Sequence, residues 1–231
     1  MRVKKSPSII CADLMNLERS LGELDTLNID AIHIDIIDGY FSPSMPLGLD
    51  IIKEMRKVCT TPFDIHLMTK NNEWFVEQLL DVDVQQITFH YETTLHIDRL
   101  ISKIKSKGIN VGVALNPATD ISVLKTILPY IDTVLIMTIN PGFASHKGED
   151  MVEYAYDKIK SLRDMAEEIG TSIDIQVDGR VSLERIPELV KCGATDLVLG
   201  SKSLFLQENT LLENSQLVDV SISKAKGVQY V

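Results

Sequence analysis

The chain has 231 residues, of which 45% are hydrophobic and 24% are charged, as expected for a soluble globular protein with one large core. Its net charge of −10 and lack of a basic run argue against a nucleic-acid partner, and no apolar run approaches the roughly 20 residues of a membrane-spanning helix. Three separated cysteines (Cys11, Cys59 and Cys192), and an N-terminus where Pro7 and Asp13 interrupt any signal peptide, favour the cytoplasm.

Short apolar runs that resemble β-strands recur along the chain and alternate with helical patterns. The eight runs are Ser6–Cys11, Ala31–Ile37, Thr61–Met68, Gln85–His90, Asn110–Leu115, Thr133–Ile139, Ile173–Val177 and Asp196–Gly200. Their spacing leaves room for a loop, a helix and a second loop in each interval. Alternating strands and helices imply a parallel sheet, and eight such units predict an α/β fold of the (β/α)8 TIM barrel type, with residues 1–231 as a single domain.

Helical signals fill the segments between these runs. Leu17–Leu27 and Ile97–Lys107 place apolar residues three and four positions apart. A long helix is expected from Glu149, and the tail from Glu208 is expected to form the last helix. Glycines stand where helices should end before the next strand, namely Gly108, Gly170 and Gly193.

Histidines and aspartates lie at the C-terminal ends of three of the expected strands. His33 and Asp35 are two positions apart in A-I-H-I-D and therefore share one face of a strand. His66 lies in D-I-H-L-M and Asp178 in I-Q-V-D-G. These strand ends meet at one face of a barrel, where active sites of this fold lie. Although a lone histidine on an apolar strand is more often a core residue, this placement predicts a metal site.

Two imidazoles and two carboxylates suit one borderline divalent cation, which would be zinc, iron, manganese or cobalt. A metal between two carboxylates is also suited to proton transfer next to a carbonyl. Asp64 shares the face of His66 and is expected to orient an imidazole instead of binding the metal. Asp38 precedes Gly39 and is expected to cap a turn or a helix.

Eight short segments, each at an expected strand end, carry a resemblance to a known family. They are Ser6–Leu14 (S-P-S-I-I-C-A-D-L), His33–Phe41 (H-I-D-I-I-D-G-Y-F), Asp64–Met68 (D-I-H-L-M), His90–Thr93 (H-Y-E-T), Gly112–Thr119 (G-V-A-L-N-P-A-T), Met137–Phe143 (M-T-I-N-P-G-F), Val177–Gly179 (V-D-G) and Leu199–Ser201 (L-G-S). In this order they resemble the ribulose-phosphate 3-epimerase family over nearly the whole chain. The resemblance implies a metal-dependent isomerase that inverts C3 of a ketose phosphate.

The resemblance assigns roles to the four residues of the expected metal site. It implies that His33, Asp35, His66 and Asp178 bind the metal and that Asp35 and Asp178 are the two catalytic acid/bases. One carboxylate would take the C3 proton and the other would return a proton to the opposite face, while the metal stabilises the enediolate. The implied reaction converts D-ribulose 5-phosphate to D-xylulose 5-phosphate.

The resemblance also implies a substrate pocket. Ser8, His66, Met68 and Met137 would line the reacting end. The phosphate would lie on backbone N–H groups of the loops that in these barrels follow strands seven and eight, here represented by Gly142, Gly179, Gly200 and Ser201. Phe143, Ala144 and Ser145 would also contact the substrate. Each residue has a plainer alternative role: a backbone-bonded hydroxyl for Ser8, core packing for the methionines and a turn requirement for the glycines.

Two loops depart from the family pattern. Where P-G-F-G/A-G-Q is usual, this chain has P-G-F-A-S-H, with Ser145 and His146, and where V-D-G-G is common it has V-D-G-R, with Arg180. We hypothesise that Arg180 contacts the phosphate; alternatively, it faces solvent at a subunit edge. His146 either touches the substrate or lies on a lid. Features shared with allulose-6-phosphate 3-epimerase leave D-allulose 6-phosphate, converted to D-fructose 6-phosphate, as an alternative substrate.

Other functions fit the sequence less well. A metal-independent decarboxylase or aldol-type synthase would carry an Asp-x-Lys pair, whereas this chain has His33 and Asp35 in that place. A non-catalytic sugar-phosphate binding barrel is an alternative that the intact metal positions argue against, and the ordered segments count against a metal-dependent hydrolase. The resemblance further implies a homo-oligomer of two or more subunits, with no nucleic-acid or membrane partner.

Overall fold

A computed structural model, which describes residues 2–142, 149–225 and 227, shows an eight-stranded sheet in which all neighbouring strands are parallel. The strands are β1 (Lys4–Pro7), β2 (Ile32–Ile37), β3 (Phe63–Met68), β4 (Gln86–His90), β5 (Asn110–Leu115), β6 (Thr133–Met137), β7 (Asp174–Asp178) and β8 (Asp196–Leu199). Their order is β1-β8-β7-β6-β5-β4-β3-β2, and a bridge between Ser8 and His33 joins the two ends. The predicted TIM barrel is confirmed.

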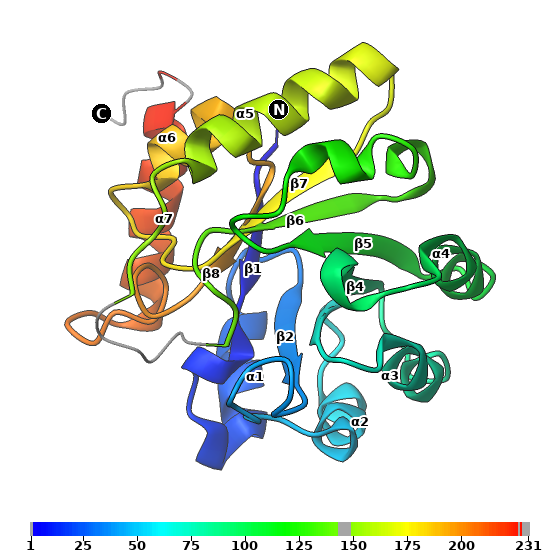
Figure 1. Cartoon of the computed structure of the whole chain (residues 1–231). Coiled ribbons are helices and arrows are strands. Elements are labelled where there is room, and N and C mark those ends of the chain that lie inside the picture. Colours follow the sequence, from blue (N-terminus) through cyan, green and yellow to red (C-terminus); the bar gives the residue numbers. More distant parts are fainter. Residues whose placement is uncertain (1, 143–148, 226, 228–231) are drawn as a thin grey trace.

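The helices lie on the outside of the strands (Figure 1). In the described part of the chain they are α1 (Leu17–Asp25), α2 (Leu49–Val58), α3 (Asn72–Leu79), α4 (Ile97–Lys105), α5 (Ala155–Ile169), α6 (Ile186–Cys192) and α7 (Leu211–Ala225). Helix α4 shows why they pack there, because it buries Leu100, Ile101 and Ile104 while its charged residues stay outside. None of the helices in these ranges is long and apolar enough to cross a membrane.

Side chains alternate in direction along each strand, so one set packs against the helices and the other set fills the barrel interior. On β2, Ile32, Ile34 and Ile36 belong to the large apolar core shared with the helices. His33 and Asp35 have the opposite direction and therefore enter the barrel. The apolar residues inside the barrel form only a small cluster, consisting of Ala114, Leu135, Met137 and Val198. Most of the barrel interior is consequently available to polar side chains.

The structure corrects two expectations about helices. The segment between β5 and β6 forms two short 3-10 helices, Ile121–Leu124 and Leu128–Tyr130, because it is short and Pro129 has no N–H to donate. Helix α5 begins at Ala155 and not at Glu149. Glu149 instead accepts hydrogen bonds from the backbone and side chain of Asn140, at 3.0 and 2.8 Å, so it belongs to the loop after β6.

Candidate active site

The four expected metal ligands converge at the C-terminal end of the barrel. His33 and Asp35 come from β2, His66 from β3 and Asp178 from β7. Parallel register places Asp35 directly beside His66. One ligand atom from each residue lies within 4.8 Å of the others. The arrangement is able to hold a metal ion.

The imidazole of His33 is oriented so that its Nε2 presents a lone pair to the cluster. Its Nδ1 contacts Asp64 Oδ2 at 2.8 Å, and because a carboxylate only accepts, Nδ1 carries the hydrogen. Its Nε2 is buried, lies 3.3 Å from Asp35 Oδ1 and has no hydrogen-bond partner among the described residues. A bound cation would satisfy this orphaned nitrogen. Asp64 therefore orients the imidazole, as expected.

His66 faces the cluster through its other nitrogen. Its Nδ1 lies 3.1 Å from Asp35 Oδ1 and 3.8 Å from Asp178 Oδ2. Its Nε2 points away and lies 3.0 Å from Nε2 of His90 on β4. Sequence reasoning gave His90 no role, and the H-Y-E-T motif was the only signal that could have found it.

The protein environment shifts the pKa values of Asp35 and Asp178 in opposite directions. Burial would raise the pKa of Asp35, but electrostatic attraction to the neighbouring imidazoles of His33 and His66 outweighs it, so this pKa lies well below its ordinary value. Burial and repulsion from Asp35 raise the pKa of Asp178 to about 7. Ser8 Oγ also donates a hydrogen bond to Asp35 Oδ2 at 3.0 Å. A bound cation would favour the ionised form of both carboxylates.

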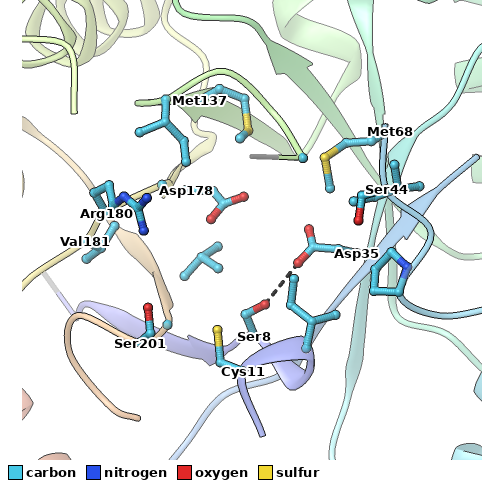
Figure 2. A pocket seen from close by; sticks show the side chains of 18 of the residues that line it. Ser8, Cys11, Asp35, Ser44, Met68, Met137, Asp178, Arg180, Val181 and Ser201 are labelled. Atoms are coloured by element: carbon cyan, nitrogen blue, oxygen red, sulfur yellow. Dashed lines mark hydrogen bonds between the residues drawn. The ribbon is translucent and has the colours of Figure 1, made fainter. Parts of the chain in front are cut away.

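A pocket of about 430 Å³ opens above this cluster. Figure 2 shows Asp35 and Asp178 entering it from different sides, with the sulfur atoms of Met68 and Met137 nearby. The other residues with an expected substrate role that line the pocket are Ser8, Gly142, Gly179, Arg180, Gly200 and Ser201. His66 is fully buried and does not line it. Phe143, Ala144, Ser145 and His146 lie outside the described residues.

Arg180 has an unusual backbone conformation in the pocket wall. Its φ is 52°, in the left-handed region that favours glycine. Its Nε donates a hydrogen bond to the carbonyl of Glu149 at 2.9 Å. The guanidinium therefore lies against the loop after β6 while the residue lines the pocket.

Comparison with known proteins identifies the family of this chain. The sequence profile of the Ribulose-phosphate 3 epimerase family matches residues 4–205. The chain belongs to this family. The ribulose-phosphate 3-epimerase of Treponema pallidum is 35% identical over 196 residues, covering 85% of this chain and 88% of the relative. That of Bacillus subtilis is 35% identical over 200 residues, covering 86% and 91%. The protein is an isomerase of the epimerase class.

Solved structures with low sequence identity share the fold of this epimerase. A tryptophan synthase alpha-subunit mutant from Pyrococcus furiosus gives a TM-score of 0.63 at 18% identity and covers 98% of each chain. Orotidine 5'-phosphate decarboxylase from Pyrococcus horikoshii gives 0.66 at 12% identity and covers 95% of this chain and 99% of its own. These similarities establish the barrel and nothing about the chemistry.

The epimerase pocket includes residues that sequence reasoning missed. They are Ile10, Cys11, Ser44, Pro46, Ile139, Val181, Val198 and Lys202. Cys11 lies within the first family segment and Lys202 directly follows the last, so proximity to these motifs was the available signal. Burial raises the pKa of the Cys11 thiol to about 11, which keeps it protonated and unreactive at neutral pH.

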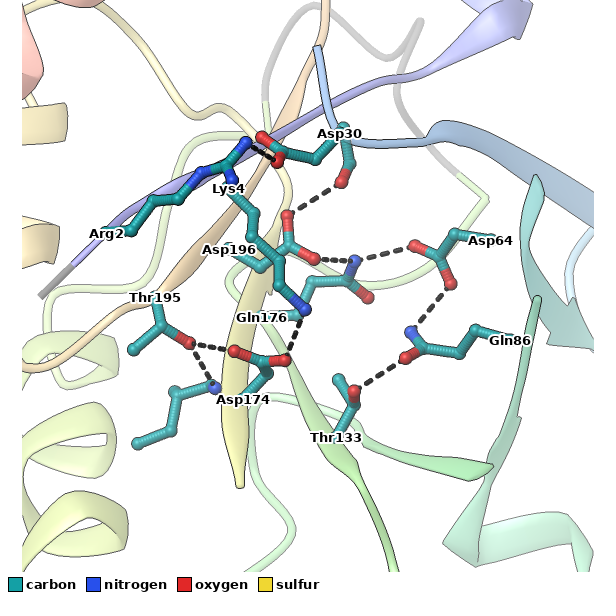
Figure 3. A network of polar contacts seen from close by, with 12 residues as sticks. Arg2, Lys4, Asp30, Asp64, Gln86, Thr133, Asp174, Gln176, Thr195 and Asp196 are labelled. Carbon is teal, nitrogen blue, oxygen red and sulfur yellow. Dashed lines mark hydrogen bonds and ion pairs between the residues drawn. The ribbon is translucent and has the colours of Figure 1, made fainter. Parts of the chain in front are cut away.

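A polar network next to the candidate metal ligands supports Asp64 (Figure 3). Gln86 donates to Asp64 Oδ1 at 2.8 Å, and Gln176 donates to Asp64 Oδ2 at 2.6 Å. Gln176 also donates to Asp196 at 2.9 Å, and Ser6 Oγ donates to Asp196 at 2.7 Å. Asp64 is thus held from below while it binds His33 above. The orientation of His33 is therefore fixed by Asp64, which is itself fixed by hydrogen bonds from Gln86 and Gln176.

Proposed function

We propose that this epimerase interconverts D-ribulose 5-phosphate and D-xylulose 5-phosphate by proton transfer at C3 between Asp35 and Asp178. The observation that carries the proposal is the entry of these two carboxylates into one pocket from β2 and β7. A carbonyl makes the hydrogen on its neighbouring carbon acidic, so one carboxylate can remove it to give an enediolate. The other carboxylate then protonates the opposite face, and their roles exchange with the direction of reaction.

The surrounding side chains support this transfer. The Ser8 hydroxyl, bonded to Asp35 Oδ2, fixes one carboxylate oxygen and leaves the other toward the imidazoles. Met68 and Met137 present apolar surface to the same pocket and exclude water from the reacting carbon. Fixed orientation and a dry pocket both favour proton exchange with the substrate over exchange with solvent.

We further propose that His33, Asp35, His66 and Asp178 hold one divalent cation, which would be zinc, iron, manganese or cobalt. The buried, unpartnered Nε2 of His33 supports this assignment. When bound, the cation supplies positive charge that polarises the substrate carbonyl and compensates the two carboxylates.

The phosphate of the substrate is proposed to bind on the β7 and β8 side of the pocket. Gly179, Gly200 and Ser201 offer backbone N–H groups there, and Gly142 also lines the pocket. Arg180 lies in the same wall and would add a charge-assisted contact.

D-allulose 6-phosphate, converted to D-fructose 6-phosphate, is a second candidate substrate. The supporting observation is that the residue replacing the second glycine of V-D-G-G, Arg180, lines the pocket and changes the wall where a longer substrate would end. A homo-oligomer and a cytoplasmic location stay predictions from the sequence, and light scattering on purified protein would test the first.

Proton exchange at C3 in deuterated water tests the proposal. Metal-loaded protein is incubated with ribulose 5-phosphate or with allulose 6-phosphate, and deuterium incorporation is followed by NMR. We expect exchange that is lost in Asp35→Asn and in Asp178→Asn but kept in Asp81→Asn, whose side chain is 89% exposed. The faster substrate identifies the natural class. Absence of exchange with either sugar, despite bound metal, would refute the proposal.

A further inference from the structure

Two buried histidines on adjacent strands share one hydrogen. His66 and His90 are both fully buried, and their rings stack with centroids 5.1 Å apart at 28°. Their Nε2 atoms are 3.0 Å apart. Two ring nitrogens at this distance attract each other only if one carries a hydrogen and the other presents a lone pair.

The contact between Glu92 and His90 determines which of the two histidines carries the shared hydrogen. The Nδ1 of His90 lies 3.1 Å from Glu92 Oε2. Glu92 is itself fixed, because its Oε1 accepts hydrogen bonds from the Asn116 backbone at 2.7 Å and from the Thr119 hydroxyl. Although partial burial acts to raise it, hydrogen bonds from His90 and Thr119 lower the pKa of Glu92 to about 2, so it is a carboxylate. A carboxylate requires a hydrogen on His90 Nδ1.

The remaining assignments follow in order. A neutral His90 with its hydrogen on Nδ1 has a lone pair on Nε2. The hydrogen between the two rings then belongs to Nε2 of His66. The Nδ1 of His66 lies 3.1 Å from Asp35 and 3.8 Å from Asp178, inside the metal cluster. It presents a lone pair there when a cation takes the place of the hydrogen that Asp35 would otherwise accept.

We propose that His90 and Glu92 are positioning residues that keep the hydrogen of His66 on Nε2 and so present its Nδ1 to the metal. The inference rests on the proposed metal site. It gives the two liganding histidines opposite tautomers: Asp64 holds the hydrogen of His33 on Nδ1, whereas His90 holds that of His66 on Nε2. Each of the two imidazoles is therefore oriented by a carboxylate. Asp64 contacts His33 directly, whereas Glu92 acts on His66 through the ring of His90.

The reverse arrangement is the clear competitor. A doubly protonated His90 would donate to both Glu92 and His66, and His66 would then carry its hydrogen on Nδ1, facing Asp35. That tautomer cannot bind a metal through Nδ1. The two arrangements differ in which nitrogen of His66 is protonated, and this is directly measurable.

Nitrogen-15 NMR of histidine-labelled, zinc-loaded protein tests the assignment, because zinc replaces the hydrogen that Asp35 would otherwise accept from His66 Nδ1. Long-range proton–nitrogen correlations distinguish Nδ1–H, Nε2–H and doubly protonated rings. We expect His66 with its hydrogen on Nε2 and His90 with its hydrogen on Nδ1. His66 protonated on Nδ1, or a doubly protonated His90, would overturn the proposal. This measurement uses the original protein and does not depend on whether any variant folds.

Zinc affinity, measured by competition with a chromogenic chelator, tests the consequence. His90→Leu removes the acceptor and should weaken zinc binding by about 10- to 100-fold. His90→Gln can place a carbonyl oxygen where His90 Nε2 lies and should retain most of the affinity. His96→Leu, at an exposed histidine of the same segment, is the matched control. Wild-type affinity in a folded His90→Leu variant would contradict the role. Neither readout uses a sugar, so failure of the proposed epimerisation would leave both results standing.

Discussion

Arg180 shows how a single residue can retain backbone strain at a binding site. Among the residues that the structure describes, it is the only non-glycine residue with a positive φ. A left-handed conformation costs an L-residue with a Cβ roughly 1–2 kcal/mol, a cost that glycine avoids. A chain that keeps arginine at this position gains something from the side chain, which fits its location in the pocket wall.

Two replacements of Arg180 separate the backbone from the guanidinium. Arg180→Ala removes the guanidinium and keeps the strain, whereas Arg180→Gly removes both. We expect the glycine variant to be more stable than the alanine variant by about 1 kcal/mol in urea unfolding. Both variants should raise the KM for the ketose phosphate by about tenfold, because both lose a charge-assisted contact. An unchanged KM in both would place the guanidinium away from the phosphate.

Site residues could be predicted from the sequence where their position follows from strand periodicity. His33, Asp35 and Asp178 could be predicted because residues two apart share a face and parallel strands end together. The role of His90 could not, since it depends on a 3.0 Å contact between β3 and β4 that strand alternation does not specify. Lys202 was missed for a similar reason, because the path of a loop decides whether its side chain reaches the pocket.

At the scale of elements, close packing inside the barrel depends on a glycine. Gly112 of β5 lies directly opposite Thr88 of β4 in the parallel register. A Cβ added at Gly112 would overlap the Thr88 side chain. Gly112 therefore provides the space that lets Thr88 point into the barrel interior, where it is fully buried.

A pair of substitutions tests this packing. Gly112→Ala should lower the free energy of unfolding by about 1–3 kcal/mol through overpacking. Combining it with Thr88→Ala should recover part of the loss, because the second change removes the overlapping atoms. Urea unfolding of the two single variants and the double variant measures the coupling. Purely additive losses would show that the clash is relieved elsewhere.

The elements differ in how far sequence determines them. Most strands were predictable because they are apolar runs that the helices cover. The first was wrong in its bounds, because β1 is Lys4–Pro7 and the expected run Ser6–Cys11 ends in a 3-10 helix, Ile9–Cys11. The start of α5 was not, since Glu149 and Asp150 are held by distant partners: Glu149 by Asn140, and Asp150 by Arg185 at 2.7 and 3.0 Å. Helical periodicity contains no information about such contacts.

At the scale of the whole molecule, the barrel buries an acid below its active site. Asp196 is 6% exposed, and burial together with repulsion from Asp64 raises its pKa to about 7. The ordinary value is 3.8, so the folded protein holds a proton that the unfolded chain releases. The stability that Asp196 contributes is therefore present below about pH 4 and is lost as the pH rises to about 7.

Asp196→Asn should remove this dependence, because an amide does not ionise. We expect the free energy of unfolding of the variant, relative to the original protein, to increase by roughly 2–3 kcal/mol between pH 5 and pH 8. Urea unfolding of both metal-free proteins at the two pH values gives the comparison. A difference that stays constant with pH would mean that Asp196 titrates near its ordinary value.

The two ends of the sheet meet along a short seam between β1 and β2. At its lower end, Asp30 and the backbone of Lys5 exchange hydrogen bonds at 2.9 Å. At its upper end lies the bridge between Ser8 and His33. Fraying of β1 from this edge would carry the Ser8 hydroxyl away from Asp35 and expose one face of His33 at the same moment. Loss of barrel closure would thus also disassemble the candidate active site, and any ligand that joins β2 to β7 also opposes opening of the ring.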